Sequence, residues 1–202
     1  MQTERLYLYT RFERFWHWAQ TVLILLLLIT GFEIHGTVKL FGFEQAFTLH
    51  NACAWAWFVL YAFIVFWMAT TGEWQHYVPT FLKLRDVIRY YLVGIFKGEP
   101  HPVPNSERAK HNPLQRLAYL GIVSALVPFQ MVTGFLYYTY NQWPQFGFAG
   151  AFSLKAIAVL HTLGAFAFLA FVVVHLYMTT TGHTLTAHIK AMFTGYEDVP
   201  KA

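Results

Sequence analysis

Four long apolar stretches separated by shorter polar segments dominate the chain. No Lys, Arg, Asp or Glu occurs in residues 15–32, 45–72, 117–154 or 156–189. Each stretch can hold a helix of about 20 residues, the length that crosses the hydrocarbon core of a membrane. The pattern predicts an all-α integral membrane protein, a bundle of four transmembrane helices at about 15–32, 49–70, 117–140 and 156–178, in a single domain over residues 1–202.

Two shorter segments have the pattern of surface helices. In residues 81–96 apolar side chains interleave with Lys83, Arg85, Asp86 and Arg89, a periodicity typical of an amphipathic helix lying on the membrane face. Residues 185–193 predict a similar, shorter helix. Within the third span, Pro128 predicts a kink.

Composition and charge agree with a membrane protein. The chain is 56% hydrophobic and 12% charged, with a mean hydropathy of +0.40, whereas soluble domains carry about 25% charged residues. All of the Lys and Arg residues except Lys39 and Lys155 lie before the first span, between the second and third, or after the fourth. The positive-inside rule then places both termini and the loop 71–116 in the cytoplasm of a multi-pass protein in a bacterial or archaeal inner membrane. Topology explains the +4 net charge, so we expect membrane lipid and no nucleic acid among the partners.

The first span also has features of a signal peptide, since a basic start precedes a Leu-rich core. The segment that follows, Gly31-Phe32-Glu33-Ile34-His35, is a poor cleavage site because it lacks a small-residue pattern. We expect a retained helix, which carries His17.

Four histidines lie in the predicted spans or at their ends: His17, His50, His161 and His175. Along a helix, 14 residues return to within roughly 40° of the same face while rising about 21 Å. One helix can therefore present His161 and His175 at two membrane depths. Each histidine alone can instead be hydrogen-bonded to a neighbouring backbone or hydroxyl group, but ionisable residues inside a membrane are functional candidates by default.

An internal repeat suggests how the histidines pair. Residues 49–58 resemble residues 160–169, and Ile-Thr-Gly-Phe at 29–32 recurs as Val-Thr-Gly-Phe at 132–135. Spans one and two therefore look like a copy of spans three and four. His50 and His161 then occupy equivalent positions facing each other in the outer leaflet. Because the position equivalent to His175 is Ile64, His17 is the remaining partner for His175 near the inner surface.

Two imidazoles at each depth favour haem over a small metal ion. Zinc sites generally need three or four converging ligands, whereas two axial imidazoles complete the coordination of a haem iron. The single cysteine, Cys53, excludes attachment through C-x-x-C-H. The sequence thus predicts two haem b groups.

Small and basic residues near the ligands allow two interpretations. Gly31, Gly134 and Gly164 either leave room for the flat macrocycle or let helices pack closely. Arg14, near His17, either pairs with a haem propionate or anchors the span at the inner surface.

Several motifs together resemble the prokaryotic four-helix di-haem cytochrome b family. They are residues 11–18 (RFERFWHW), the Thr30-Gly31 end of the Leu-rich run, residues 110–119 (KHNPLQRLAY), and the His161/His175 pair. That family includes the γ subunit of formate dehydrogenase-N, the b-type cytochrome of nickel-iron hydrogenases and the membrane anchor of thiosulfate reductases.

The resemblance implies roles for particular residues. It implies that His17 with His175 ligates an inner haem and His50 with His161 an outer haem. It also implies a quinone, menaquinone or ubiquinone, bound near the inner haem by residues at the positions of Asn112 and Gln115. Here Pro113-Leu114 departs from the Gly-containing family pattern, and Asn112 equally suits an N-cap followed by proline at the first helical position.

The resemblance further implies electron transfer between the quinone pool and a periplasmic iron-sulfur or multihaem oxidoreductase subunit. The outer loops, about 33–48 and 141–155, are too short to hold a substrate domain, so catalysis would reside in that partner. Three alternatives stay open: a stand-alone membrane cytochrome acting as a quinone-linked oxidoreductase on a small molecule, a proton or metal transporter, and an inert assembly anchor.

Overall fold

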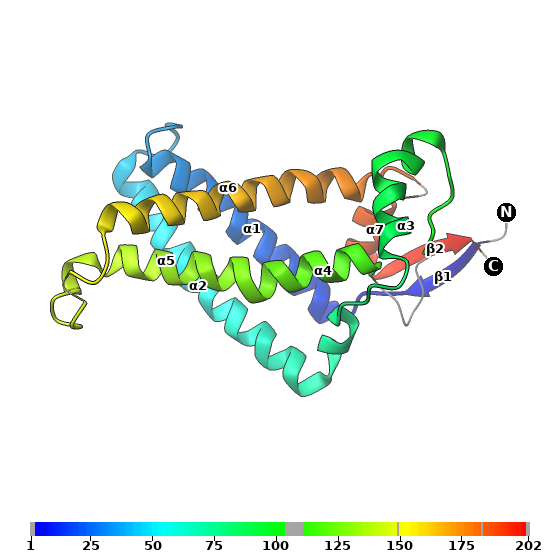
Figure 1. Cartoon of the computed structure of the whole chain (residues 1–202), viewed down its shortest axis with the longest axis horizontal. Helices are drawn as coiled ribbons and strands as arrows, with labels where there is room; N and C mark the ends of the chain where they lie inside the picture. The colour runs from blue at the N-terminus through cyan, green and yellow to red at the C-terminus, as the bar shows by residue number, and fades with distance from the viewer. Residues whose placement is uncertain (1–2, 104–110, 149, 183, 201–202) are drawn as a thin grey trace. The chain divides into compact units, whose positions relative to one another are not determined.

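The computed structural model describes residues 3–103, 111–148, 150–182 and 184–200, and in these residues four helical stretches are long and apolar enough to cross a membrane (Figure 1). They are α1 (Arg11–Ile34), α2 (Phe43–Thr71), the stretch Pro113–Tyr138 and α6 (Leu154–Thr179). The four predicted spans are confirmed. Large apolar side chains such as Phe15, Val59 and Phe66 are about two-thirds exposed on these helices, as expected of surfaces that face lipid.

All four helical stretches begin before the spans predicted from charge, and all but the third, which ends at Tyr138, also end beyond them. Helix α1 begins at Arg11 because Thr10 caps it: the Thr10 amide donates to Glu13 Oε2 at 2.7 Å, and the Glu13 amide donates to Thr10 Oγ1 at 3.3 Å. This reciprocal pair is a capping box. Helix α2 begins at Phe43, six residues before the predicted span. Hydropathy marks the apolar core, whereas the helices continue into the polar boundary.

Pro128 lies just after a widened turn in the third membrane stretch. Helix α4 (Pro113–Gly121) continues through a π-helical turn, Ile122–Leu126, into α5 (Val127–Tyr138). Proline has no amide hydrogen, and its ring collides with the carbonyl four residues earlier, here that of Ser124. The π turn adds one residue at that point and relieves the collision.

The two predicted surface helices are confirmed as helices. The first is α3 (Leu84–Arg89), which continues through a π turn (Tyr90–Gly94) and a 3-10 turn (Ile95–Lys97). It begins after Lys83, whose φ of 58° is left-handed and ends the preceding loop. The second is α7 (Ala187–Thr194). Their position on the membrane surface stays a prediction.

A two-stranded sheet joins the terminal segments, and the sequence did not indicate it. Strand β1 (Thr3–Tyr7) pairs antiparallel with β2 (Tyr196–Pro200), with Tyr7 opposite Tyr196 (Figure 1). Gly195 makes the turn into β2 with φ of 88°, and its carbonyl accepts the amides of Leu8 and Tyr9 at 2.9 and 3.2 Å. A side chain there would place Cβ 2.7 Å from the Tyr9 carbonyl oxygen. The position therefore needs glycine both for its conformation and for space.

The chain forms two compact units. The first comprises Met1–His17, Phe63–Val123 and Met178–Ala202, and the second comprises Trp18–Ala62 and Ser124–Tyr177. In the first unit Leu8, Val87 and Ala191 are almost fully buried. Arg108, Lys110 and Lys201, which contributed to the predicted orientation, lie outside the described residues.

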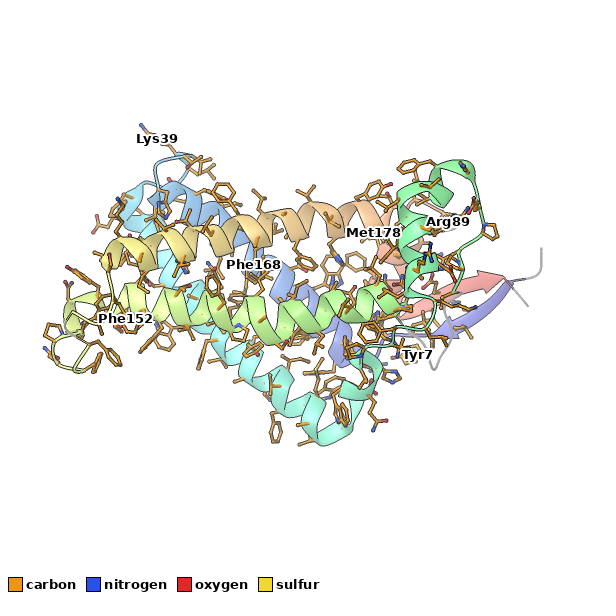
Figure 2. All side chains as sticks on the ribbon, viewed as in Figure 1. Tyr7, Lys39, Arg89, Phe152, Phe168 and Met178 are labelled. Atoms are coloured by element: carbon orange, nitrogen blue, oxygen red, sulfur yellow. The ribbon has the colours of Figure 1, made fainter. Side chains whose placement is uncertain are left out.

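The second unit contains parts of α1 and α2, all of α5 and most of α6. Trp57 of α2 packs edge-on against Phe168 of α6, with ring centres 5.5 Å apart, and both are buried. The loop after α1 is tied down by the buried Glu33, whose Oε1 accepts the amides of Leu40, Phe41 and Gly42 at 2.7–2.8 Å. Lys39, at the tip of this loop, projects outward into the surroundings (Figure 2).

Candidate functional site

The imidazoles of His50 and His161 meet inside the second unit. His50 lies on α2 and His161 on α6, and their ring centres are 6.4 Å apart with the planes at 76°. Both rings line a cavity of about 1000 Å³. Its walls come from α1, α2, α5 and α6 and are mostly aliphatic and aromatic; they include Leu27, Phe47 and Phe135. A mostly apolar cavity with a few converging polar groups is typical of a cofactor or ligand site.

A threonine on the neighbouring helix contacts each of these histidines. Thr30 Oγ1 lies 2.9 Å from His50 Nδ1, and Thr133 Oγ1 lies 3.1 Å from His161 Nδ1. Each hydroxyl also donates to the carbonyl four residues earlier on its own helix, that of Leu26 at 2.6 Å or Phe129 at 2.8 Å.

The direction of these hydrogen bonds determines the tautomer of both histidines. Because each hydroxyl hydrogen is committed to a helix carbonyl, the oxygen must accept from the imidazole, so Nδ1 carries the proton. Both Nε2 atoms then carry a lone pair, which can accept a hydrogen bond or bind a metal.

The glycine after each threonine admits the histidine ring. A Cβ on Gly31 would lie 3.3 Å from His50 Cε1, and a Cβ on Gly134 would lie 3.0 Å from His161 Cε1. At both glycines the neighbouring group is an imidazole, which fits the interpretation of close packing, while room for a macrocycle stays a prediction. The repeated Thr-Gly pair thus positions equivalent histidines on α2 and α6 in the same way.

Gln130 of α5 is the polar cavity residue that sequence reasoning missed. Its Nε2 lies 3.3 Å from His161 Nε2 and 3.2 Å from the His161 carbonyl oxygen. Sequence reasoning considered ionisable groups, whereas Gln130 carries a neutral amide. An amide within an apolar span was the available signal.

A second polar group that the sequence search missed lies at the edge of the cavity. The exposed His35, just after α1, has its Nε2 3.3 Å from Oγ1 of Thr162, the residue after His161. Both residues line the cavity, as does Asn51 beside His50. Polar groups therefore lie at the exposed side of an otherwise apolar site.

The structure does not determine the predicted inner pair. His17 belongs to the first unit, and His175 belongs to the second, where its ring stacks on Phe171 with centres 5.4 Å apart. The pairing of His17 with His175 stays a prediction.

Arg14 makes local contacts in the first unit. Its Nε donates to the Thr10 carbonyl at 3.4 Å, and Nη1 donates to the Phe193 carbonyl of α7. These bonds join the beginning of α1 to α7, and anchoring of the span at the inner surface stays a prediction. Contact with a propionate stays a prediction.

Asn112 and Gln115 form a capping box at the beginning of α4, also in the first unit. Asn112 Oδ1 accepts the Gln115 amide at 2.9 Å, and Gln115 Oε1 accepts the Asn112 amide at 2.9 Å, with Pro113 following as the first helical residue. The N-cap interpretation is confirmed. Asn112 Nδ2 also donates to the Tyr91 hydroxyl at 3.1 Å. Burial raises the pKa of Tyr91 and keeps this hydroxyl protonated, while the bond from Asn112 opposes that shift.

Next to this cap lies a cluster of aromatic rings. The His111 ring centre is 5.2 Å from that of Tyr77 and 5.0 Å from that of Tyr119. Burial, followed by the charge of Glu13, raises the pKa of Tyr77. The predicted quinone residues thus lie near a group of titratable side chains, of which His111 is buried and Tyr77 and Tyr119 are half-buried.

Within the described residues, four stretches of membrane length and an imidazole pair in a mostly apolar cavity indicate a membrane protein with a cofactor or ligand site. Residues 8–195 match the family described as prokaryotic cytochrome b561. The chain belongs to this family, and it is a multi-pass membrane b-type cytochrome.

Two curated relatives agree with this assignment. The chain is 32% identical over 200 residues to the putative cytochrome YdhU of Escherichia coli strain K12, covering 96% of this chain and 75% of the relative. It is 25% identical over 194 residues to a probable Ni/Fe-hydrogenase B-type cytochrome subunit of Rhodobacter capsulatus, covering 85% of this chain and 72% of the relative.

Proposed function

We propose that this protein is a di-haem membrane subunit that transfers electrons between a periplasmic oxidoreductase partner and the quinone pool. The paired imidazoles of His50 and His161, each held by a threonine, are the observation that carries the proposal. Haem b would supply a one-electron carrier at each of two membrane depths.

The spacing of the outer pair fits one metal centre between two imidazoles. A metal ion lies about 2 Å from an imidazole nitrogen, and the ring centre lies roughly 1 Å behind that nitrogen, so two imidazoles on one metal have centres about 6 Å apart. The rings of His50 and His161 are 6.4 Å apart. The cavity beside them, about 1000 Å³, is at the upper end of the usual size for cofactor sites.

The threonines prepare these histidines for a metal. A histidine ligand commonly donates its second N–H to an oxygen, which fixes the tautomer and makes the ligating nitrogen more basic. Thr30 and Thr133 take this role for His50 and His161. His50 and His161 would hold the haem together, and a haem held by two imidazoles would supply electron transfer rather than binding of a small molecule.

We assign the inner haem to His17 and His175, with Arg14 close to His17 in sequence as a propionate partner. The support is the sequence: His175 shares α6 with His161 at a different membrane depth, and His17 lies near the basic end of α1. We place quinone at Asn112 and Gln115, which lie near the aromatic group of Tyr77, His111 and Tyr119. Such hydroxyl and imidazole groups can exchange protons with a reducing quinone.

We infer an inner-membrane location with both termini and the long loop 71–116 in the cytoplasm. The distribution of basic residues supports this orientation. The loops after α1 and α5 then face the periplasm and expose apolar side chains such as Leu40, Phe41 and Phe146. These loops are where we expect the oxidoreductase partner, since the Rhodobacter relative is named as a subunit of a hydrogenase.

Haem content of single-histidine variants tests the proposal. Wild-type protein purified in mild detergent should contain two haem b groups per chain, measured from reduced-minus-oxidised spectra and a chemical haem assay. His161→Ala and His50→Ala should each lose the same single haem, and His17→Ala should lose the other. His76→Ala, which removes a histidine paired with Glu73 at 3.5 Å, is the control and should keep both.

Two outcomes would contradict the proposal. A wild-type preparation without haem removes the function as a whole. Two full haems in His161→Ala remove the assignment of the outer ligands.

A further inference from the structure

Gln130 places an amide directly against one of the paired histidines. Its Nε2 lies 3.3 Å from His161 Nε2, while its Oε1 is buried and has no hydrogen-bond partner within the described residues. An unpaired carbonyl in an apolar interior costs free energy. A residue that carries this cost in a membrane helix is a candidate for a specific role.

The hydrogen bonds around His161 fix what the amide does. The Thr133 hydroxyl donates to Phe129 and accepts from His161 Nδ1, so His161 Nε2 is an acceptor. Gln130 Nε2 is therefore the donor to that lone pair. The same amide nitrogen donates to the His161 backbone carbonyl at 3.2 Å. Gln130 thus caps the nitrogen that we assign to iron.

Helix α6 has a space shaped for this amide. A Cβ on Gly164 would collide with Gln130 Oε1. Of the two sequence interpretations of Gly164, room for a macrocycle or close packing, the structure therefore supports close packing, and the packed group is the amide.

The internal repeat shows that this arrangement is specific to one half. The position equivalent to Gln130 in the first half is Leu27, and the position equivalent to Gly164 is Cys53. His50 therefore has its threonine and glycine partners but an aliphatic residue where His161 has an amide. The two histidines of the pair are not equivalent.

We propose that Gln130 is a releasable cap on His161, an inference that rests on the proposed haem function. The amide of Gln130 donates to the His161 Nε2 lone pair. That lone pair can bind either an amide hydrogen or iron, so formation of the iron bond requires that the hydrogen bond from Gln130 breaks. Gln130 is a positioning residue that opposes haem entry from the α6 side and leaves His50 as the unopposed ligand.

Haem titration of haem-free protein tests the cap. Gln130→Met keeps the length of the side chain and removes the donor, and Gln130→Leu installs the residue found at the equivalent position of the first half. Both should bind haem at the outer site roughly tenfold more tightly than the wild type, because the loss of one hydrogen bond to the ligand nitrogen removes a competitor for iron. Gln20→Leu, at a glutamine of α1 that does not line the cavity, is the matched control and should leave the affinity unchanged.

A second measurement detects the hydrogen bond from Gln130 to His161 Nε2 without haem. In haem-free protein with ¹⁵N-labelled histidine, the His161 Nε2 resonance should shift in Gln130→Met and stay in place in Gln20→Leu. Unchanged or weaker outer-haem affinity in both Gln130 variants would overturn the proposal, as would an unshifted resonance. A wild-type protein that binds no haem would instead overturn the proposed function.

Discussion

At the scale of single residues, a Thr-Gly pair both hydrogen-bonds a histidine and leaves space for its ring. In each half of the chain a threonine accepts the Nδ1 proton, and the glycine after it gives the ring space to approach the helix. Each threonine hydroxyl donates its own hydrogen to a carbonyl of its helix, so no polar group of this contact is left unsatisfied in the apolar interior. The repeat was visible in the sequence, but its contact with the histidines was not.

The space at Gly134 can be tested with one methyl group. Gly134→Ala would place Cβ 3.0 Å from His161 Cε1, and displacing the ring should cost about 1–3 kcal/mol in outer-haem binding. Haem content and haem affinity measure the effect. Gly121→Ala, at a helical glycine whose added Cβ meets nothing within 4 Å among the described residues, should keep both haems. Equal haem affinity in the two variants would show that the ring does not need this space.

The Thr133 hydroxyl should set the reduction potential of the outer haem. Thr133→Val removes the acceptor for His161 Nδ1, which makes the imidazole a weaker donor and destabilises the oxidised iron. We expect the midpoint potential of one haem to rise in a redox titration while the other stays constant. Thr139→Val is the control, because Thr139 is also buried and bonds the carbonyl four residues earlier at 2.8 Å. A potential that moves equally in both variants would argue against the role of Thr133.

At the scale of elements, helix ends and irregular turns follow local chemistry. The N-cap at Asn112 was expected from the Asn-Pro pair, whereas the return bond from Gln115, which completes a capping box, was not predicted. The π turn before Pro128 was not expected in that form, because proline dictates that a bond is lost while the packing around it selects a kink or a wider turn.

Asn112 allows its structural and functional roles to be separated. Asn112→Ser keeps an oxygen that can cap α4, whereas Asn112→Ala loses the cap and should cost about 1 kcal/mol in stability. If the Asn112 amide contacts quinone, Asn112→Ser should slow haem reduction by a quinol several-fold without lowering the melting temperature. Stopped-flow absorbance measures the rate. A wild-type rate in Asn112→Ser would leave Asn112 with the capping role alone.

At the scale of the whole molecule, the terminal segments close the first unit. Strand β1 begins within a few residues of one end of the chain, and β2 ends within a few residues of the other. The cation of Arg5 lies 4.6 Å from the ring centre of Tyr196 across this pair. Contacts between such distant segments constrain more of the chain than a local turn does.

Gly195 should be the sensitive point of this closure. Gly195→Ala combines a left-handed backbone with a Cβ that would lie 2.7 Å from the Tyr9 carbonyl oxygen. Gly36→Ala has a similar φ, 76°, but an added Cβ meets nothing within 4 Å among the described residues, so it carries only the backbone strain of about 1–2 kcal/mol. Thermal unfolding in detergent should therefore show the larger loss for Gly195→Ala. Equal losses of melting temperature would mean that the segment around Tyr9 moves to make room for the added Cβ.

Sequence reasoning reached different depths for different parts of the candidate site. It predicted that His50 and His161 face each other, because residues at equivalent positions of an internal repeat occupy equivalent places in the fold. It missed Gln130, His35 and the threonine contacts, because none of these belongs to a ligand motif and each acts across helices. The His17 and His175 pair stays a prediction because the two residues lie in different units.

The sequence by itself determined the four spans, the two surface helices and the cap of α4. These depend on hydropathy, periodicity and capping, which act between residues near one another in the chain. Only the tertiary structure decided the pairing of the terminal strands, the threonine bond to each histidine and the amide of Gln130 against His161. These contacts join residues that are 20 to almost 200 positions apart, and only the packing of side chains in three dimensions selects among the many partners that a sequence allows.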